Sequence, residues 1–393
     1  MIITESRLLD RKVLKDGHKI DQSLLWMVVL MTAFSMLMIY SASIAEAATN
    51  GVHSFHYVIR QMAFVSIGVM CAVSASLVSM AKWQRMTPMI LTISFVALIL
   101  VLVLGRNIKG ATRWIDLGPV NLQPTEIYKL AIILYLSSFF TRRAEVLTNI
   151  KRMIAPGVLA GLGFGLILKQ PDFGSFMVVC FVTLGLLFLA GLPWKWFMAM
   201  VAASIVGAAM LVIFEPYRMK RVLGFLNPWE DPYGKGYQLT HSLMALARGE
   251  WTGVGLGASV EKRGFLPEAH TDFILAIVGE EFGFLGVLLL IVCYAWIVWR
   301  ALTIAKQARD LELFFGSFVA QGIALWLGMQ SFINIGVNIG LLPTKGLTLP
   351  LMSYGGSSVI MALISMALLL RVDYENRCRM RGFNVDTAVQ KKH

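Results

Sequence analysis

The chain has 393 residues, of which 57% are hydrophobic and only 15% are charged. This composition is too apolar for an ordinary soluble domain. The formal net charge of +12 does not indicate a nucleic-acid-binding protein, because most of the Lys and Arg residues fall in short loops that we expect to face anionic lipid. The composition therefore predicts a membrane protein and excludes nucleic acid as a partner.

Apolar stretches long enough to cross about 30 Å of hydrocarbon recur along the whole chain. They predict an all-α polytopic fold with ten transmembrane helices and a large outer loop between the seventh and the eighth. The predicted spans are residues 22–43, 56–80, 87–104, 125–140, 153–168, 174–190, 196–214, 272–299, 313–338 and 351–370.

The distribution of the Lys and Arg residues predicts the orientation of the bundle. If the N-terminus is cytoplasmic, most of the 35 cationic side chains lie in inner segments, as the positive-inside bias requires. We therefore expect residues 1–21 to form a cytoplasmic N-terminal segment and residues 22–371 the membrane domain. Residues 372–393 are then a cytoplasmic tail, so that both termini lie in the cytoplasm.

The longest connection, residues 215–271, lies on the predicted outer side. Long connections in compact domains usually have a functional role. This one contains Trp and Tyr residues among Pro and Gly, so we expect an ordered cap rather than a loose tether. Short amphipathic helices that fold over the outer mouth of the bundle are the predicted structure.

Several cations oppose the positive-inside bias, because they lie on the predicted outer side. Cations gathered on the unfavourable side need a compensating anion, and lipid headgroups supply only part of it. The pattern predicts an anionic substrate at the outer leaflet. Five of these cations cluster in the 105–124 loop, in the helix that follows it, or before the last helix: Arg106, Lys109, Arg113, Lys129 and Lys345.

The segment QPTEIYKL, residues 123–130, places Glu126 in the first turn of a helix and Lys129 three residues later. One interpretation is ordinary helix chemistry, because Glu suits the helix dipole and an ion pair at this spacing is common. The other is functional, because ionisable side chains inside an apolar span usually face a cavity. Both interpretations stay open on the sequence.

The segment LPEAHTDFILAIVGEE, residues 266–281, carries Asp272 at the start of an apolar span. Asp commonly caps a helix by accepting a backbone N–H, which gives one interpretation. Glu268 and His270, however, lie within one turn of it, and Glu280 and Glu281 follow two turns deeper. Adjacent Glu residues in a membrane span are hard to explain by packing, and the sequence leaves their roles open.

Other patterns predict structure rather than chemistry. The segment GVGLGASVEKRG, residues 253–264, lacks the preceding strand and the GK[ST] of a phosphate-binding loop, so we expect a turn. Asn334 and Asn338 share one helix face, which predicts hydrogen bonds between helices. The four Cys residues provide neither a disulfide framework nor a paired metal spacing.

Four segments together resemble a known family of polytopic bacterial proteins. They are GATRWIDLGPVNLQPTEIYKL, FLNPWEDPYGKGYQLTHSLMALARGE, LPEAHTDFILAIVGEEFG and LPTKGLTLPLMSYGGSS. In this order they resemble the SEDS family, and its cell-division branch more closely than its elongation branch. The resemblance covers nearly all of residues 20–376.

The resemblance implies a peptidoglycan glycosyltransferase that polymerises lipid II at the outer face of the bacterial cytoplasmic membrane. The essential aspartate of the family falls on Asp272, and its Glu and Lys at the start of the fourth helix fall on Glu126 and Lys129. The implied partners are a class B penicillin-binding protein, which crosslinks the new strands, and the division machinery that FtsZ organises at the septum.

The chemistry of this reaction agrees with these residues. A sugar hydroxyl is a poor nucleophile at neutral pH, so a carboxylate base helps it to attack, and we assign this role to Asp272. A departing pyrophosphate needs cations rather than a second acid, and Arg113, Lys262 and Lys345 are the candidates. Mg²⁺ or Mn²⁺ on the pyrophosphate is compatible with this chemistry, but the sequence contains no recognisable metal-ligand set.

Two other functions remain open on the sequence. A lipid II flippase also needs buried charges and a basic outer mouth, although no internal repeat typical of transporters is visible. A scaffold that only recruits division proteins is the second. An enzyme that uses a base requires the carboxylate of Asp272, whereas a flippase or a scaffold tolerates its conversion to Asn.

Overall fold

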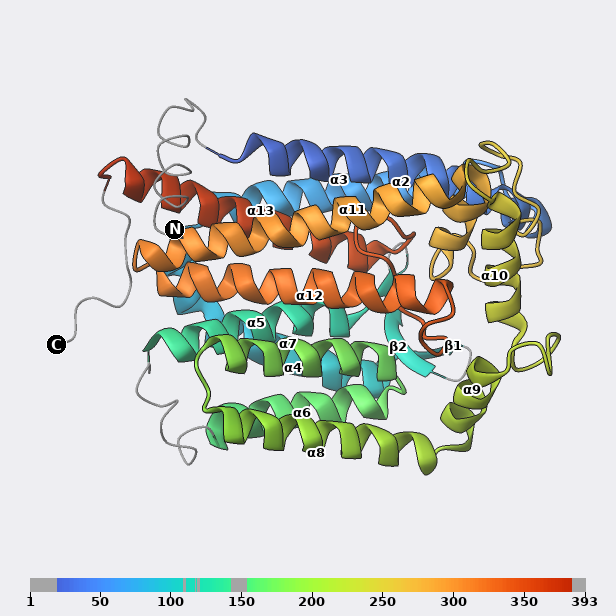
Figure 1. Cartoon of the computed structure of the whole chain (residues 1–393). Helices are drawn as coiled ribbons and strands as arrows, with labels where there is room; N and C mark the ends of the chain where they lie inside the picture. Colours follow the sequence, from blue (N-terminus) through green and yellow to red (C-terminus); the bar gives the residue numbers. More distant parts are fainter. Residues whose placement is uncertain (1–19, 109–110, 117, 119–120, 143–153, 384–393) are drawn as a thin grey trace.

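The computed structural model of the chain describes residues 20–108, 111–116, 118, 121–142 and 154–383 (Figure 1). Most of the predicted terminal segments, and Lys109, lie outside the described residues. The helices run roughly side by side along one direction, apart from two short ones at one end. They are α2 (Gln22–Thr49), α3 (His56–Leu77), α4 (Met80–Leu104), α5 (Pro124–Arg142), α6 (Ile154–Lys169), α7 (Phe173–Leu189), α8 (Trp194–Ile213), α9 (Pro216–Leu226), α10 (Tyr237–Gly249), α11 (Ile274–Asp310), α12 (Phe314–Asn338) and α13 (Gly356–Met380).

Each of the ten predicted spans overlaps one helix, although several ends differ, as for 351–370 against α13. Helices are expected where apolar segments must satisfy their backbone polar groups internally. Within the described part of the chain, seven helices are long and apolar enough to cross a membrane: α2, α3, α4, α8, α11, α12 and α13. The helices α6 and α7 are apolar but shorter, and α5 carries Glu126 and Lys129 in its first turns. The protein is thus a multi-pass helical membrane protein.

The bundle has an inner core and a periphery. The helix α12 is buried along most of its length and packs against α11, α5 and α7, while α13 packs against α3. In contrast, α8 has no buried residue and contacts mainly α7 and α9. The start of α2 and the end of α13 lie at the same end of the bundle, opposite α9 and α10 (Figure 1).

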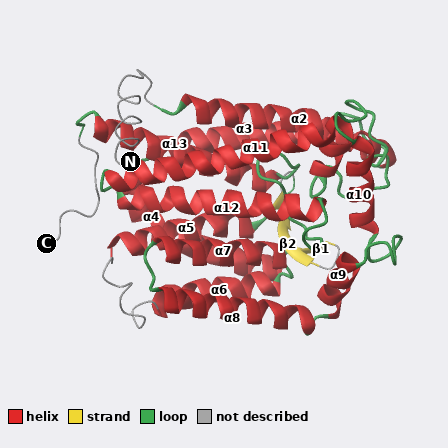
Figure 2. Ribbon diagram, viewed as in Figure 1, coloured by secondary structure: helices red, strands yellow, loops and turns green. Residues whose placement is uncertain are grey.

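The 105–124 loop forms a small antiparallel sheet, so the all-α prediction was wrong there. The strands are β1 (Arg106–Ile108), β2 (Ala111–Asp116) and β3 (Asn121–Leu122), in the order β1-β2-β3 (Figure 2). The segment ATRWID of β2 is rich in residues that favour strands, but three short strands are too weak a pattern to read from sequence. The sheet fixes Arg113 at the mouth of the bundle.

The segment 215–271 contains two short helices, α9 and α10, which lie across one end of the bundle (Figure 1), as expected for an ordered cap. The segment from residue 250 to the start of α11 is a series of turns, as predicted for the glycine-rich stretch. The helix α10 packs against α11. This cap therefore lies on the part of α11 that follows Asp272.

The predicted span 272–299 is interrupted rather than continuous. Gly283 has φ 67° and ψ −165°, so α11 consists of two helices joined at a kink. The glycine-rich turn fills the break: the carbonyls of Glu280 and Glu281 accept the N–H groups of Val254 and Gly255 at 3.0 and 3.1 Å. A broken helix exposes backbone polar groups, and the neighbouring loop satisfies them here.

The two adjacent glutamates also have structural partners. The carboxylate of Glu280 accepts the N–H of Val260 at 2.8 Å and the hydroxyl of Ser259. The carboxylate of Glu281 pairs with the ammonium of Lys262 at 2.6 Å and accepts the hydroxyl of Ser41, on α2, at 2.6 Å. Both glutamates thus anchor the glycine-rich turn, residues 253–264, to the kinked helix, which answers the question that the sequence left open.

We expect Gly283→Ala to lower the melting temperature of the purified protein. This backbone conformation is almost restricted to glycine and costs about 1–3 kcal/mol for other residues, and a Cβ here lies only 2.4 Å from the Gly253 nitrogen. Gly165→Ala on α6 is the matched control, because its Cβ meets no atom within 4 Å. Equal melting temperatures for the two variants contradict the strained kink.

Candidate active site

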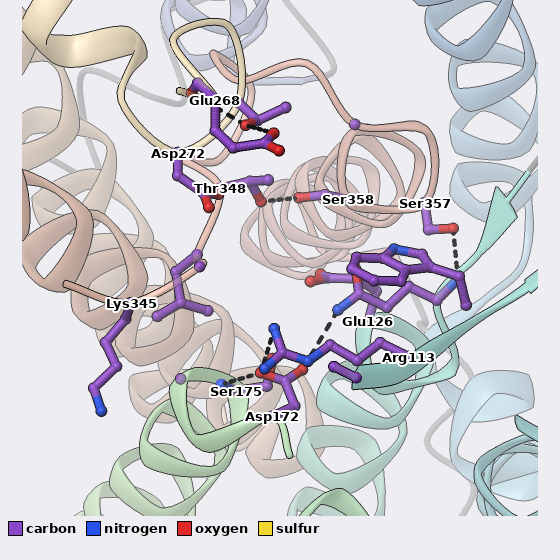
Figure 3. Close-up of a pocket in the computed structure, with 18 of the residues that line it drawn as sticks. Arg113, Glu126, Asp172, Ser175, Glu268, Asp272, Lys345, Thr348, Ser357 and Ser358 are labelled. Atoms are coloured by element: carbon purple, nitrogen blue, oxygen red, sulfur yellow. Dashed lines mark hydrogen bonds and ion pairs between the residues drawn. The ribbon is translucent and has the colours of Figure 1, made fainter. Parts of the chain in front are cut away.

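A cavity of about 830 Å³ lies at the end of the bundle that α9 and α10 cover. Its walls come from segments far apart in the sequence: α3, the sheet, the starts of α5, α7 and α13, the cap, and the loop before α13. Four of the six predicted site residues line it, namely Asp272, Glu126, Arg113 and Lys345. Figure 3 shows these side chains around the cavity.

Asp272 lies in the turn that precedes α11, outside the helix itself. The N-cap position belongs to Phe273, and no side chain of that residue caps the helix. Asp272 is partly exposed, and the surface it exposes lines the cavity. The capping interpretation of Asp272 was therefore wrong, and its carboxylate remains available to a ligand.

The surroundings of Asp272 shift its acidity towards neutrality. Burial of the carboxyl group and the neighbouring Glu268 carboxylate raise the pKa of Asp272 to about 7. The guanidinium groups of Arg113 and Arg221 oppose this rise, and Asp172 adds a smaller upward contribution to the same pKa. Loss of solvation disfavours the charged form of an acid. Near neutral pH this carboxyl group therefore both binds and releases a proton readily.

Arg113 of β2 faces Asp272 across a narrow gap. Its Nη2 donates to the carbonyl of Pro171, and its Nη1 lies 3.9 Å from a carboxylate oxygen of Asp172. A Cβ placed on Gly346 lies 3.3 Å from Oδ2 of Asp272 and 3.7 Å from Nη1 of Arg113. The absence of a side chain at Gly346 thus keeps open the space between a carboxylate and a guanidinium.

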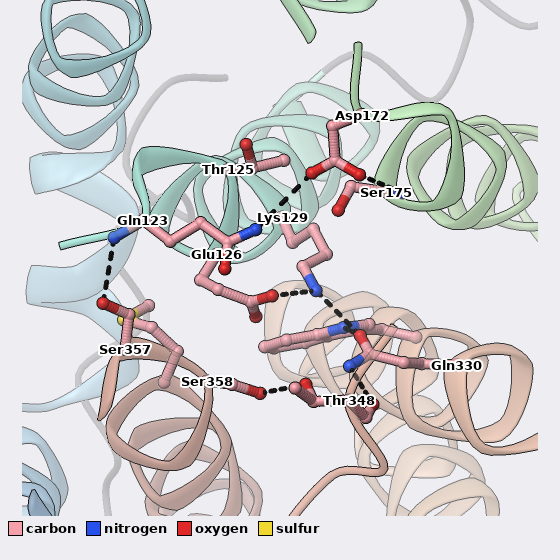
Figure 4. A network of polar contacts seen from close by, with 12 residues as sticks. Gln123, Thr125, Glu126, Lys129, Asp172, Ser175, Gln330, Thr348, Ser357 and Ser358 are labelled. Atoms are coloured by element: carbon pink, nitrogen blue, oxygen red, sulfur yellow. Dashed lines mark hydrogen bonds and ion pairs between the residues drawn. The ribbon is translucent and has the colours of Figure 1, made fainter. Parts of the chain in front are cut away.

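Glu126 and Lys129 form the predicted ion pair in the first turns of α5 (Figure 4). The Nζ of Lys129 donates to Oε1 of Glu126 and to Oε1 of Gln330, at 2.7 Å each. Both charged residues are buried, at 3% and 2% exposure. Glu126 lines the cavity, and its other oxygen, Oε2, has no hydrogen-bond partner among the described residues. Lys129 lies behind it and does not line the cavity.

The remaining two predicted cations differ in position. Lys345 lines the cavity, and its Nζ lies 4.1 Å from the centre of the Phe173 ring, on the side away from Asp272 in Figure 3. Lys262 does not line the cavity. It is buried, and its ammonium is held by Glu281 and Ser41 at 2.6 and 2.8 Å. The prediction that Lys262 contacts phosphate does not fit this position.

Five charged residues of the cavity wall were not among the predicted site residues: Arg60, Asp172, Glu215, Arg221 and Glu268. Arg221 comes from α9, in the long loop whose charges carry no topological information, and it donates to the Thr344 carbonyl at 3.2 Å. Arg60 comes from α3, and it is a further cation that falls on the predicted outer side if the N-terminus is cytoplasmic. Asp172 caps α7 by accepting the N–H of Ser175 at 3.2 Å. The sequence contained a signal for two of the five: the charge of Arg60, and the place of Glu268 within one turn of Asp272.

The described residues include no group of three or more His, Cys, Asp or Glu side chains that could hold a metal ion. Mg²⁺ usually binds through one or two carboxylates together with substrate phosphates. Asp272, Glu268 and Asp172 provide carboxylates along the cavity. A Mg²⁺ or Mn²⁺ ion in this cavity therefore needs ligands from the substrate in addition to these carboxylates.

The fold and the cavity define a class of protein: a multi-pass helical membrane protein with a charged site at one mouth of the bundle. Comparisons with known proteins identify the family. The model of the family described as "Cell cycle protein", which groups FtsW, RodA and SpoVE, matches residues 21–378. The chain belongs to this family, the SEDS family.

Similar proteins include two described as "Probable peptidoglycan glycosyltransferase FtsW". The one from Neisseria gonorrhoeae is 54% identical over 96% of this chain and 90% of its own length. The one from Burkholderia thailandensis is 46% identical over 97% of this chain and 82% of its own length.

Solved structures with the same fold also cover most of the chain. A chain from "Structural coordination of polymerization and crosslinking by a peptidoglycan synthase complex" is 30% identical, with a TM-score of 0.74 over 91% of this chain and 98% of its own. The rod shape determining protein RodA of Thermus thermophilus is 28% identical, with a TM-score of 0.68 over 92% of this chain and 97% of its own.

Proposed function

We propose that the protein is a peptidoglycan glycosyltransferase that polymerises lipid II into glycan strands, with Asp272 as the catalytic base. The similar proteins named peptidoglycan glycosyltransferase FtsW support the activity. The assignment of the base is carried by one observation: the carboxylate of Asp272 does not cap α11 and faces a cavity lined with guanidinium groups. A base and nearby cations are what this transfer requires.

The reaction forms a bond between the acceptor sugar's 4-oxygen and the anomeric carbon of the donor. Asp272 takes the proton of the attacking hydroxyl, and the bond between the anomeric carbon and the pyrophosphate oxygen breaks. General base catalysis of this kind contributes about 10²- to 10⁴-fold. The products are a longer strand, a polyprenyl pyrophosphate and a proton on Asp272, which then passes to water.

The departing pyrophosphate gains negative charge as the bond breaks. Cations that are already in place stabilise such charge without reorganisation. Arg113 and Arg221 act on Asp272 electrostatically and line the same cavity, so they are the first candidates for this role. Arg60 and Lys345 are further cations of the wall. Glu126, through its unpartnered Oε2, accepts a hydrogen bond from a sugar hydroxyl or amide.

The proposed topology places the cavity at the outer face of the bacterial inner membrane, at the division septum. It has ten membrane spans, namely the seven long apolar helices together with α5, α6 and α7, and both termini are cytoplasmic. The excess of Lys and Arg in the inner segments supports this orientation. Residues 1–21, 22–371 and 372–393 are the N-terminal segment, the membrane domain and the tail, with the outer cap at 215–271.

The proposed partner is a class B penicillin-binding protein that crosslinks the new strands. The structural relative whose description couples polymerisation to crosslinking supports this pairing, and the division machinery organised by FtsZ is the proposed setting because the similar proteins are named FtsW.

The purified protein, with and without this partner, tests the function on lipid II in detergent. Glycan strands of increasing length are the expected product. Movement of lipid II across vesicles without strand formation favours a flippase instead.

The pH dependence of polymerisation follows from the pKa of Asp272. A base must be deprotonated to act, and this carboxyl group has a pKa of about 7. We expect kcat/KM to fall about tenfold per pH unit below pH 7 and to level off above it. Initial rates between pH 5.5 and 8.5 measure this. An acid limb centred near pH 4, the range of an ordinary Asp, contradicts the raised pKa.

A further inference from the structure

Two buried asparagines of α12 hold the backbone around Asp272. The Nδ2 of Asn334 donates to the carbonyls of Asp272 and Leu347, at 2.9 and 2.6 Å. The Nδ2 of Asn338 donates to the same Asp272 carbonyl at 3.1 Å, and its Oδ1 accepts the backbone N–H of Ala276 at 3.2 Å. Asn334 is 2% exposed and Asn338 is fully buried, so water does not compete for these bonds.

The bond from Ala276 is a helix cap supplied by another helix. The first N–H groups of an α-helix lack partners within the helix, and a Ser, Thr, Asp or Asn at the N-cap normally accepts one of them. At α11 the N-cap residue is Phe273, which has no such side chain. Asn338 provides the side-chain acceptor instead, in addition to the Phe273 carbonyl, which accepts the same N–H at 3.0 Å. The adjacent Asp272 makes no cap and lines the cavity.

We infer that Asn338 and Asn334 are positioning residues for Asp272. Asn338 caps the start of α11 from the neighbouring helix α12, and Asn334 joins the backbone of Asp272 to the loop that carries Lys345 and Gly346. The inference rests on the proposed glycosyl transfer, because it assigns how the base of that reaction is held. Asn334 bridges two carbonyls, one on each side of the gap at Gly346. A shift of about 1 Å in such geometry costs up to about 100-fold in rate.

Loss of the cap has a chemical signature. Without Asn338 the Ala276 N–H retains only its backbone acceptor, the Phe273 carbonyl at 3.0 Å, and we expect the carboxylate of Asp272 to take the place of the lost side-chain acceptor. A carboxylate that accepts backbone N–H bonds has a lowered pKa, so the acid limb of the rate profile moves to lower pH. The other charged groups around Asp272 stay unchanged in this variant, namely Glu268, His270, Arg113, Arg221, Asp172 and Lys345.

The experiment compares three leucine variants of the full-length protein with its penicillin-binding partner, on lipid II: Asn338→Leu, Asn334→Leu and Asn376→Leu. Asn376 is the matched control, because it is fully buried and donates to the Ile304 carbonyl at 3.0 Å on α11, at the far end of the bundle. All three variants lose a buried amide. The melting temperature is expected to fall least for Asn376→Leu, which loses one hydrogen bond, and most for Asn338→Leu, which loses four, so rates are compared at equal folded fractions.

We expect Asn338→Leu to lower kcat roughly 10- to 100-fold and to shift the acid limb to lower pH. Asn334→Leu is expected to lower kcat without moving the acid limb, because the cap at Ala276 remains. Asn376→Leu changes neither. Similar kcat values and acid limbs for all three variants, at equal folded fractions, overturn the inference. Where a leucine variant does not fold, serine at the same three positions gives the same comparison.

Hydrogen exchange at residues 273–277 separates this inference from the proposed function. Asn338→Leu is expected to exchange faster there than wild type and Asn376→Leu. If the wild-type protein forms no strands from lipid II, the proposed function is contradicted. The exchange rates still test whether Asn338 caps α11, because they do not depend on catalysis. Unchanged exchange in Asn338→Leu overturns the capping role even when polymerisation is normal.

Discussion

Asp272→Asn is expected to reduce lipid II polymerisation by about 10²- to 10⁴-fold, the contribution of a general base, while the melting temperature stays the same or rises slightly. The amide preserves the shape of the side chain but cannot take a proton. Stability is preserved because Phe273, and not Asp272, lies at the N-cap of α11, and because a neutral amide avoids the cost of burying a carboxylate.

Asp231→Asn is the matched control for this variant. Asp231 is an exposed acid of the same outer segment, and its carboxylate accepts the N–H of Lys235 at 3.0 Å, a bond that Asn also accepts. Polymerisation is expected to stay at the wild-type rate. Strand synthesis by purified protein with its partner is the measurement. Near wild-type synthesis by Asp272→Asn excludes Asp272 as the base and favours a flippase.

Lys129→Met is expected to destabilise the protein by about 3–5 kcal/mol, the usual cost of leaving a buried charge without its partner. Glu126 is 3% exposed and Lys129 is the partner of its Oε1. The displaced carboxylate also changes the wall of the cavity, so lipid II polymerisation is expected to be lost. Thermal unfolding and strand synthesis measure the two effects.

The double variant Glu126→Gln/Lys129→Met separates charge from packing. Removal of both charges is expected to recover much of the lost stability, because no unpaired ion remains, while polymerisation stays impaired. Lys82→Met, at an exposed position of α4, is the control and is expected to change neither property. Binding of the penicillin-binding partner is measured in parallel. A Lys129→Met protein that makes strands normally but loses its partner supports the scaffold function.

Much of the fold follows from the sequence because hydropathy and helix periodicity are local properties. Ten apolar spans were predicted, and each overlaps a helix. The break at Gly283 was not predicted, because it depends on the glycine-rich turn, whose N–H groups donate to the backbone carbonyls of Glu280 and Glu281. A glycine in an apolar run does not indicate from the sequence that a distant loop packs against the helix at that position.

The site was predictable only in part, for a related reason. The Glu126–Lys129 pair depends on a spacing within one helix, and the structure contains it at 2.7 Å. Lys262 is held by Ser41 of α2 and by Glu281, so its position depends on how α2 packs against the glycine-rich turn. These contacts keep its ammonium outside the cavity. Arg221 and Asp172 reach the cavity from segments whose patterns resemble ordinary surface charge and ordinary helix capping.

The sequence by itself determined that the protein is a bundle of apolar helices, which charged residues depart from the hydropathy pattern, and that Asp272 stands where an apolar span begins. The tertiary structure decided what Asp272 does there. Asp272 lines a cavity whose walls come from segments far apart in the sequence, and Asn338 of another helix accepts the N–H of Ala276 at the start of α11. Such a contact joins residues 62 positions apart, and only the packing of helices against one another brings them together.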